Sequence, residues 1–371
     1  KYCLLVSFSM LRTCIAAAAF FGALVAADRR SSSSVVPSHA SHAPGNGNSG
    51  VPGCEALKNA GLGDRVLFPT DAGYEPEIAT WWALNTRLRP YCLVLPESSQ
   101  EVAVALKALV EANDGAGDWH IALRSGGHAS TEINNIVQGV TIDLSMLNST
   151  SYDSEAGVAH IGSGARWRDV YTDLAQSGVT VAGGRDGGVG VGGYLLGGGI
   201  SFYQGEIGWS CDQVVNYEVV LGNGSIINAN CTANADLWKA LKGGGSNFGI
   251  VTRFDMEVLP SIDLYYELRF LSSNYSDAVV DLVVGYANSN TSLADDAIIA
   301  YYSHNSSISP DIYLAAIHVN THGIANTPTP FDDVKNLPAL VNVTTFQSMA
   351  EAAIGSQLPG GTRSVIFELL H

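Results

Sequence analysis

The 371-residue chain is 46% hydrophobic and only 15% charged, which excludes an intrinsically disordered protein and allows two domains with a hydrophobic core. Its 35 acidic and 19 basic residues give a formal net charge of −16. Because an acidic surface repels phosphate backbones, nucleic acid is not an expected partner.

The first 27 residues have the features of a secretory signal peptide. An apolar run over 14–26 follows Arg12, and the small residues at 25–27 are typical of a cleavage site before Asp28. A membrane span needs about 20 apolar residues, so a cleaved signal fits better than an anchor. We therefore expect a secreted, extracellular protein that has no membrane association after cleavage.

Potential glycosylation sites and cysteines agree with export. Seven asparagines begin Asn-x-Ser/Thr sequences, namely Asn148, Asn223, Asn230, Asn274, Asn290, Asn305 and Asn342. The four cysteines after the signal are Cys54, Cys92, Cys211 and Cys231. Their spacing does not resemble a zinc site and no His pair accompanies them, so structural disulfides fit better than free thiols and no metal site is expected.

The first predicted elements lead to a glycine turn. Residues 28–53, rich in Ser, His, Pro and Gly, are expected to form a flexible leader. Residues 98–111 have apolar residues at helical spacing after a start close to a capping box. A strand over 119–123 then runs directly into residues 124–128.

The middle of the chain predicts strands at 140–144, 158–162 and 179–182, with a helix over 167–177. The densest glycine region, 183–199, follows directly.

After it, Asn223-Gly224 is a strong hairpin signal between strands at 216–221 and 225–228. A short helix over 237–241 and a second glycine segment, 243–249, come before the last strand of this part.

Beyond Pro260 the glycine density falls. Strands at 264–271, 297–302 and 312–319 alternate around a helix over 277–287. This pattern predicts a second domain with a sheet and outer helices.

The turn Ser125-Gly126-Gly127-His128 ends a predicted strand. Several backbone N–H groups in such a turn form a nest that holds phosphate oxygens, as in the pyrophosphate of a dinucleotide. His128 would then face the cofactor. Taken alone, the segment also fits an ordinary turn with a surface histidine.

The glycine region contains a literal G-x-G-x-x-G at Gly188, Gly190 and Gly193, with Asp212 about 20 residues further on. This spacing favours a Rossmann domain that binds NAD. That motif needs a helix directly after it, however, and the glycines at 197–199 would break such a helix within its second turn.

The turn at 124–128, the glycine region at 188–199 and the segment at 243–251, in this order, resemble the p-cresol methylhydroxylase-type FAD-binding domain. The resemblance is to its berberine bridge enzyme-like branch, which includes fungal extracellular flavin oxidases. It implies the α+β class, with a two-subdomain FAD-binding domain of the p-cresol methylhydroxylase/vanillyl-alcohol oxidase type over 54–260. A sheet-and-helix substrate domain would follow over 261–371.

The resemblance also implies roles for single residues. His128 would bond covalently to the flavin methyl group, and the turn before it would hold the pyrophosphate. Some members add a second bond from a Cys at the position of Asp186, so a single bond is implied here. Val189 matches members that use oxygen, and Cys54 and Cys92 match the family's N-terminal disulfide. The implied FAD-binding residues are Ser125, Gly126, Gly127, His128, Val189, Gly190, Gly192, Gly193, Gly197, Gly198, Gly199, Ile200, Gly249, Ile250 and Val251.

Relatives of this type continue through the substrate domain and return to the FAD domain with a Tyr/Asn-rich segment. The present sequence ends at His371 without one, so we expect a truncated substrate domain. No catalytic base can be named. Tyr301, Tyr302 and His304 lie on a predicted strand, and packing explains them better than catalysis.

The sequence therefore predicts a secreted FAD-dependent oxidoreductase, and specifically an oxidase. A hydride would pass from a C–O or C–N carbon of a small-molecule substrate to covalently bound FAD, and then to O2. The alternatives are an NAD-dependent Rossmann dehydrogenase and a non-catalytic secreted glycoprotein that retains the fold.

Overall fold

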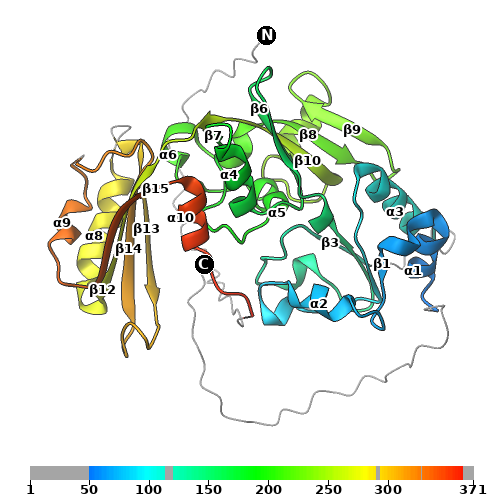
Figure 1. Ribbon diagram of the computed structural model, residues 1–371, viewed down its shortest axis with the longest axis horizontal. Helices are drawn as coiled ribbons and strands as arrows, with labels where there is room; N and C mark the ends of the chain where they lie inside the picture. Colours follow the sequence, from blue (N-terminus) through cyan, green and yellow to red (C-terminus); the bar gives the residue numbers. More distant parts are fainter. Residues whose placement is uncertain (1–49, 113–119, 290–292, 327, 362–371) are drawn as a thin grey trace.

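The computed structural model describes residues 50–112, 120–289, 293–326 and 328–361. The predicted signal peptide, most of the predicted leader and Asn290 lie outside these ranges. Two units stand side by side in Figure 1: a larger one up to about residue 260, and a smaller sheet with helices formed by residues 264–347. The α+β prediction is confirmed.

The first sheet of the larger unit has the order β1-β2-β4-β3. Its strands are β1 Val66–Leu67, β2 Cys92–Val94, β3 Ile121–Arg124 and β4 Val140–Asp143. The last three strands run parallel, which brings the carboxyl ends of β3 and β4 to one edge. This edge is where the predicted glycine turn begins.

Two helices cover this sheet. Helix α3 (Ser99–Glu111) begins as predicted, because the Ser98 side chain accepts a hydrogen bond from the Glu101 backbone N–H. Helix α1 (Pro52–Leu57) is joined to β2 by the disulfide Cys54–Cys92, so the expected pairing is confirmed. Since α1 begins at Pro52 and buries Gly53, the end of the predicted leader is already folded.

The second sheet of the larger unit is antiparallel, in the order β5-β6-β10-β8-β9. Its strands are β5 Thr150–Asp153, β6 Val158–Gly162, β8 Val214–Val220, β9 Ile226–Asn230 and β10 Ile250–Glu257. The predicted hairpin joins β8 to β9, and Gly224 adopts the positive φ of +81° that favours glycine there. A short pair, β7 Val179–Thr180 with β11 Leu259–Pro260, lies beside it.

Short helices connect and cover this sheet: α4 Trp167–Ala175, α5 Val191–Leu196, α6 Gln204–Ile207 and α7 Ala235–Leu241. Helix α2 (Tyr74–Ala79) instead packs against Leu67 and Leu93 of the first sheet, on the face opposite α1 and α3. Helix α4 buries Trp167, Val170 and Leu174 in the main core, as its apolar spacing predicts.

Cys211 and Cys231, whose pairing the sequence left open, are both free thiols, so the preference for disulfides over free thiols is confirmed only for Cys54 and Cys92. The hairpin register pairs Asn216 with Asn230, which places Cys231 just beyond the end of β9. Cys211 instead lies buried in the turn before β8, where its carbonyl accepts a hydrogen bond from the Lys242 ammonium group.

The smaller unit is a four-stranded antiparallel sheet in the order β13-β14-β12-β15. Its strands are β12 Leu264–Ser272, β13 Asp296–Ser303, β14 Tyr313–Asn320 and β15 Ala339–Gln347. Helices α8 (Ser276–Ala287) and α9 (Asp332–Lys335) pack on one face. The other face contributes Tyr266, Ile317 and Val319 to the main core, which therefore continues between the units.

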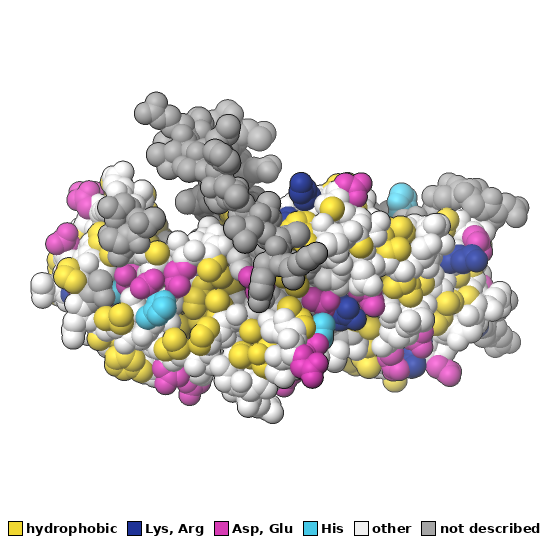
Figure 2. Space-filling model, turned by 90° about the horizontal axis from the view of Figure 1, so that it is seen from above, with side chains coloured by type: hydrophobic (Ala, Val, Ile, Leu, Met, Phe, Trp, Pro, Cys, Tyr) yellow, Lys and Arg dark blue, Asp and Glu magenta, His cyan; other side chains and the backbone are white. Residues whose placement is uncertain are grey.

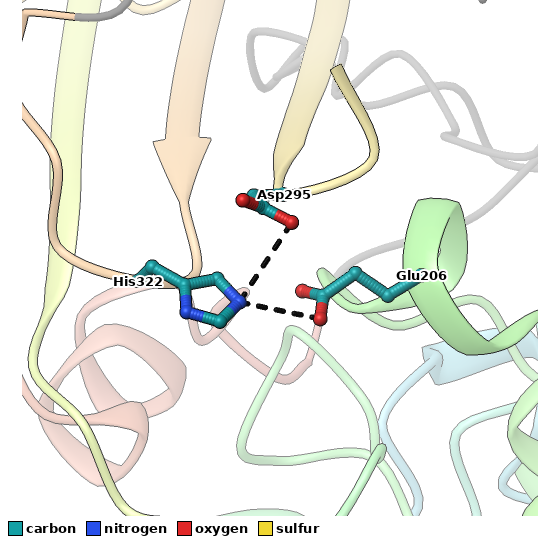
Figure 3. Close-up of side chains that lie close together, drawn as sticks. All are labelled: Glu206, Asp295 and His322. Atoms are coloured by element: carbon teal, nitrogen blue, oxygen red, sulfur yellow. Dashed lines mark hydrogen bonds and ion pairs between the residues drawn. The ribbon is translucent and has the colours of Figure 1, made fainter. Parts of the chain in front are cut away.

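Two further contacts join the units. Helix α10 (Met349–Gly355), which follows the smaller sheet, packs against α4 (Figure 1). At the other end, Glu206 of α6 faces His322 and Asp295 (Figure 3), with 3.3 Å from His322 Nε2 to Glu206 and 3.7 Å to Asp295. The Thr321 hydroxyl donates a hydrogen bond to Glu206 at 2.6 Å.

The surface agrees with the composition. Acidic side chains are spread over the face seen in Figure 2, and basic side chains are few there. Within the described ranges, no helix is long and apolar enough to cross a membrane.

Candidate functional site

A cavity of about 510 Å³ opens between the end of β3, the segment around α5 and the start of β10. It collects twelve of the predicted site residues, namely Ser125, Gly126, Gly127, His128, Val189, Gly190, Gly192, Gly193, Gly197, Gly249, Ile250 and Val251. Segments more than 120 residues apart in sequence thus line one cavity, as expected.

The glycines permit two main chains to cross at van der Waals distance. A Cβ atom on Gly126 would lie 2.5 Å from the Cα atom of Gly190, and one on Gly190 would meet Gly126 equally closely. The Ser125 hydroxyl fixes the crossing, because it accepts a hydrogen bond from the Gly192 N–H at 3.1 Å and donates one to the Ser163 carbonyl at 2.6 Å. Backbone rather than side chains therefore forms this wall.

Gly198, Gly199 and Ile200 do not line the cavity, so their predicted role is not supported by this geometry. Gly198 and Gly199 adopt φ angles of +104° and +78°, and they turn the chain toward the segment before β8. Their carbonyls accept hydrogen bonds from the backbone N–H groups of Cys211 and Ser210. Their positive φ angles are explained by this chain reversal, and their role in FAD binding stays a prediction.

The Rossmann alternative is also excluded by the fold. Helix α5 spans only Val191–Leu196 and ends at Gly197, as the glycines at 197–199 predicted. The strand before it, β7, pairs antiparallel with β11, whereas the Rossmann motif needs parallel strands around its helix.

Arg124 lies buried beneath the glycine turn and holds it in place. Its guanidinium forms ion pairs with Asp143 and Glu77 and stacks 3.9 Å above the ring of Trp81. A Cβ atom on Gly127, whose φ is +64°, would come within 2.8 Å of the Arg124 Nε atom. The sequence motif contained Arg124, but its partners are distant in sequence and carried no signal.

His128 forms part of the cavity wall. Its ring stacks on Trp82, with ring centroids 4.7 Å apart, and its side chain is 20% exposed. Burial lowers the pKa of His128 below its ordinary value, although the nearby carboxylate of Asp186 opposes this shift. The Nε2 atom is buried and has no hydrogen-bond partner among the described residues. A neutral imidazole with an unsatisfied nitrogen therefore stands at the cavity.

Asp186 is the acidic group beside His128, with 3.7 Å between its Oδ2 atom and His128 Nε2. Backbone N–H groups orient both carboxylate oxygens: Gly188 donates to Oδ1 at 2.7 Å and Leu358 donates to Oδ2 at 3.1 Å. The aspartate is thus held by two different segments of the chain.

Leu358 belongs to a segment that we call the strap (residues 356–361), which follows α10. The Leu358 carbonyl accepts a hydrogen bond from the Trp82 indole at 3.3 Å, and the Gly361 N–H donates to the Trp82 carbonyl at 2.7 Å. The strap therefore positions Trp82 as well as Asp186. Nothing in the sequence of the strap indicated this role.

Other cavity residues also escaped sequence reasoning. Tyr194 of α5 lines the cavity and bonds the Ser210 hydroxyl at 2.9 Å, and burial raises its pKa. Arg166 binds the Gly188 carbonyl and supports the glycine segment from behind. A single Tyr or Arg in or beside a predicted helix gives no sequence pattern that would distinguish a residue at a binding site from a residue that only packs.

The three side chains of the predicted strand near 301–304 do not line the cavity. Tyr301 packs against the main core, the Tyr302 hydroxyl donates to Ser276, and a ring nitrogen of His304 lies 3.3 Å from the Pro310 carbonyl. These contacts agree with packing roles.

Comparisons with known proteins identify a domain family and similar proteins. Residues 90–230 match the FAD binding domain family. The FAD-dependent monooxygenase sdcF of Emericella nidulans is 33% identical over 317 residues, which cover 84% of this chain and 65% of that protein. The chain thus spans just under two thirds of this relative's length.

Solved structures show the same fold. The berberine bridge enzyme-like protein 1 of Physcomitrella patens superposes with a TM-score of 0.69 at 22% identity, over 83% of this chain and 68% of that one. The glucooligosaccharide oxidase from Acremonium strictum, described with a 6-S-cysteinyl, 8α-N1-histidyl FAD, gives 0.65 at 22% identity, over 80% and 61% of the two chains.

The cavity fits FAD on its own geometry, because glycine backbones leave room where Cβ atoms would intrude and a buried imidazole nitrogen has no partner among the described residues. Residues 90–230 therefore belong to the FAD binding domain family, the chain is similar to FAD-linked oxidoreductases, and its fold is that of the p-cresol methylhydroxylase-type, berberine bridge enzyme-like flavoproteins.

Proposed function

We propose that this protein is a secreted oxidase that holds FAD covalently through His128 and passes electrons from a small-molecule substrate to O2. The observation that carries the proposal is His128 itself, a largely buried imidazole in the cavity wall directly after a glycine turn. The histidyl FAD of the Acremonium strictum oxidase, which has the same fold, supports a covalent bond of this kind.

The residues of the chain have distinct tasks in this proposal. Bound FAD supplies a two-electron acceptor, and the protein supplies its position and electrostatic environment. The turn over 125–127 offers backbone N–H groups to the pyrophosphate, and Arg124 keeps this turn rigid from below. The glycine walls at 190–193 and 249–251 allow a flat ring system to approach the main chain.

Export is the second part of the proposal. Five of the potential glycosylation sites within the described residues are exposed, namely Asn148, Asn223, Asn274, Asn305 and Asn342. The Cys54–Cys92 disulfide suits an oxidising compartment. The test uses protein from the culture medium. Enzymatic deglycosylation should lower its mass, and N-terminal sequencing should find a start near Asp28. An intact segment of residues 1–20 would contradict cleavage of the signal.

The experiment for the catalytic part starts from the visible spectrum of the purified protein. A flavin spectrum is expected, whereas a colourless protein after incubation with FAD would favour a non-catalytic glycoprotein. Dithionite-reduced protein mixed with O2 in a stopped-flow instrument should then regain its yellow colour and release one hydrogen peroxide per flavin. Reoxidation no faster than that of free reduced flavin would contradict the use of O2.

A monooxygenase is a second candidate, since that is the activity named for the sdcF relative. Both activities consume O2, but a monooxygenase places one oxygen atom in the product. Once a substrate is found, turnover under ¹⁸O2 separates the two: unlabelled product supports the oxidase, and labelled product supports the monooxygenase.

A further inference from the structure

Asp186 is the charged side chain with an oxygen close to the unsatisfied nitrogen of His128. The 3.7 Å separation is slightly longer than a hydrogen bond, so a small rotation of the imidazole would close it. Arg166 is the other charged group that acts on His128, and the ring of Trp82 covers one face of the imidazole. Among the described residues, Asp186 is therefore the acidic group placed to accept a proton from Nε2.

The aspartate is also prearranged for this task. Its two oxygens are fixed by backbone N–H groups from its own loop and from the strap, and its side chain is only 10% exposed. A carboxylate held in this way does not need to reorganise when a proton arrives. Each oxygen still has a lone pair for a further donor.

The geometry points to Asp186 as the positioning residue that orients His128 and accepts its proton while the flavin is being attached. This inference rests on the proposed covalent attachment. In the overall step one C–H bond of the flavin methyl group and the Nε2–H bond of His128 break, and a C–N bond forms at His128 Nδ1. The two electrons and two protons released reduce one O2 to hydrogen peroxide.

The physical reason is control of the imidazole tautomer. A hydrogen bond from Nε2–H to Asp186 leaves the lone pair on Nδ1, which is the nucleophilic nitrogen. As the C–N bond forms, the ring gains positive charge, and the adjacent carboxylate stabilises this charge before taking the proton. Without Asp186 the proton would have to leave to water in a buried site.

The test follows the attachment itself rather than turnover. Full-length apoprotein from a riboflavin-auxotrophic host is mixed with FAD, and acid-stable flavin fluorescence in gels is recorded over time beside total flavin binding. Asp186→Ala and the isosteric Asp186→Asn should bind FAD as the unmodified protein does. They should attach it about 100-fold more slowly, the lower end of what a positioned proton acceptor contributes.

Two readouts separate this role from mere support of the loop. Formate should accelerate attachment in Asp186→Ala, which leaves room for it, but not in His128→Ala. The attachment rate of Asp186→Asn should rise with pH, because hydroxide replaces the missing acceptor, more steeply than that of the unmodified protein. Asp173→Asn, an exposed aspartate on α4, is the matched control and should attach FAD at the normal rate.

The outcomes distinguish this inference from the proposed function. Attachment at the normal rate in both Asp186 variants would overturn the role of Asp186 and leave covalent attachment intact. Slow attachment without formate rescue or a changed pH profile would also overturn it, in favour of a structural role. If the protein with the wild-type sequence binds FAD but attaches none covalently, covalent attachment and this inference both fail.

Discussion

The cavity of the larger unit and the sheet of the smaller unit are built in different ways. At the cavity, main chains cross at Gly126 and Gly190 and leave space for a ligand. In the smaller sheet, by contrast, polar side chains pair in the interior. His318 bonds Asp296 at 2.7 Å, and Arg269 pairs with Glu267 on the helix-covered face. The cavity wall is shaped by the absence of side chains at its glycines, and the smaller sheet is held by contacts between buried polar side chains.

The largest expected effect comes from breaking the ion pair beneath the cavity. Arg124→Ala leaves Asp143 as an unpaired buried charge, which should lower the free energy of unfolding by about 3–5 kcal/mol and abolish FAD binding. Urea unfolding and flavin titration measure both. The control is Arg89→Ala, which removes an exposed pair with Glu75 and should cost below about 1 kcal/mol. Equal losses in the two variants would contradict the account.

A variant in the smaller sheet tests whether the stability of this sheet affects FAD binding in the cavity. Asp296→Ala leaves His318 and Asn320 without their buried acceptor. Because two donors lose a partner, we expect a loss of about 2–3 kcal/mol in the free energy of unfolding. FAD affinity, measured by fluorescence titration at a temperature where the variant is folded, should stay normal. A marked loss of FAD affinity would mean that the smaller sheet and the cavity are energetically coupled.

A methyl group tests the cavity wall directly. Gly126→Ala would place its Cβ atom 2.5 Å from the Gly190 backbone, so the crossing must open, at a cost of about 1–3 kcal/mol. Gly193→Ala is the matched change, because no described atom outside its own helix and chain neighbours lies within 4 Å of its Cβ position. Thermal unfolding should show a lower midpoint for the first variant and no loss for the second. The opposite order would refute a wall built by backbone contact.

The smallest effect is expected where the units meet at the surface. Glu206→Gln weakens the contact with His322, whose side chain is 45% exposed. Solvent screening keeps such pairs below about 1 kcal/mol, and added salt should reduce the difference from the unmodified protein further. Urea unfolding at low and high salt measures this. A loss of several kcal/mol would mean that this contact, rather than the shared apolar core, joins the units.

The difference between the cavity and the smaller sheet also explains which features could be predicted from the sequence. The turn at 125–128 was assigned because it is followed in order by two further glycine segments, at 188–199 and 243–251, as in the family that the sequence resembles. Taken alone, the turn also fitted an ordinary turn with a surface histidine. Gly198 and Gly199 were predicted to bind FAD but do not line the cavity. A chain reversal with positive φ favours glycine as strongly as a close approach to a ligand does, so the sequence does not separate these two roles.

Elements fixed by distant partners were missed for the same reason. Strand β15 exists through its pairing with β12, while its own apolar residues Leu340, Val343 and Phe346 are largely exposed. The strap reaches Asp186 and Trp82, and Asp186 approaches His128, only in the folded chain. The free state of Cys211 likewise depends on where the turn before β8 places it.

The central claim is that His128 is the residue that carries the flavin in this cavity. Trypsin should release residues 125–166 as one peptide, because cleavage sites follow Arg124 and Arg166. In acid-denatured, cofactor-loaded protein, mass spectrometry should find this peptide with the added mass of FAD, and fragmentation should place that mass on His128. An unmodified peptide, with all flavin in the acid supernatant, would contradict the claim.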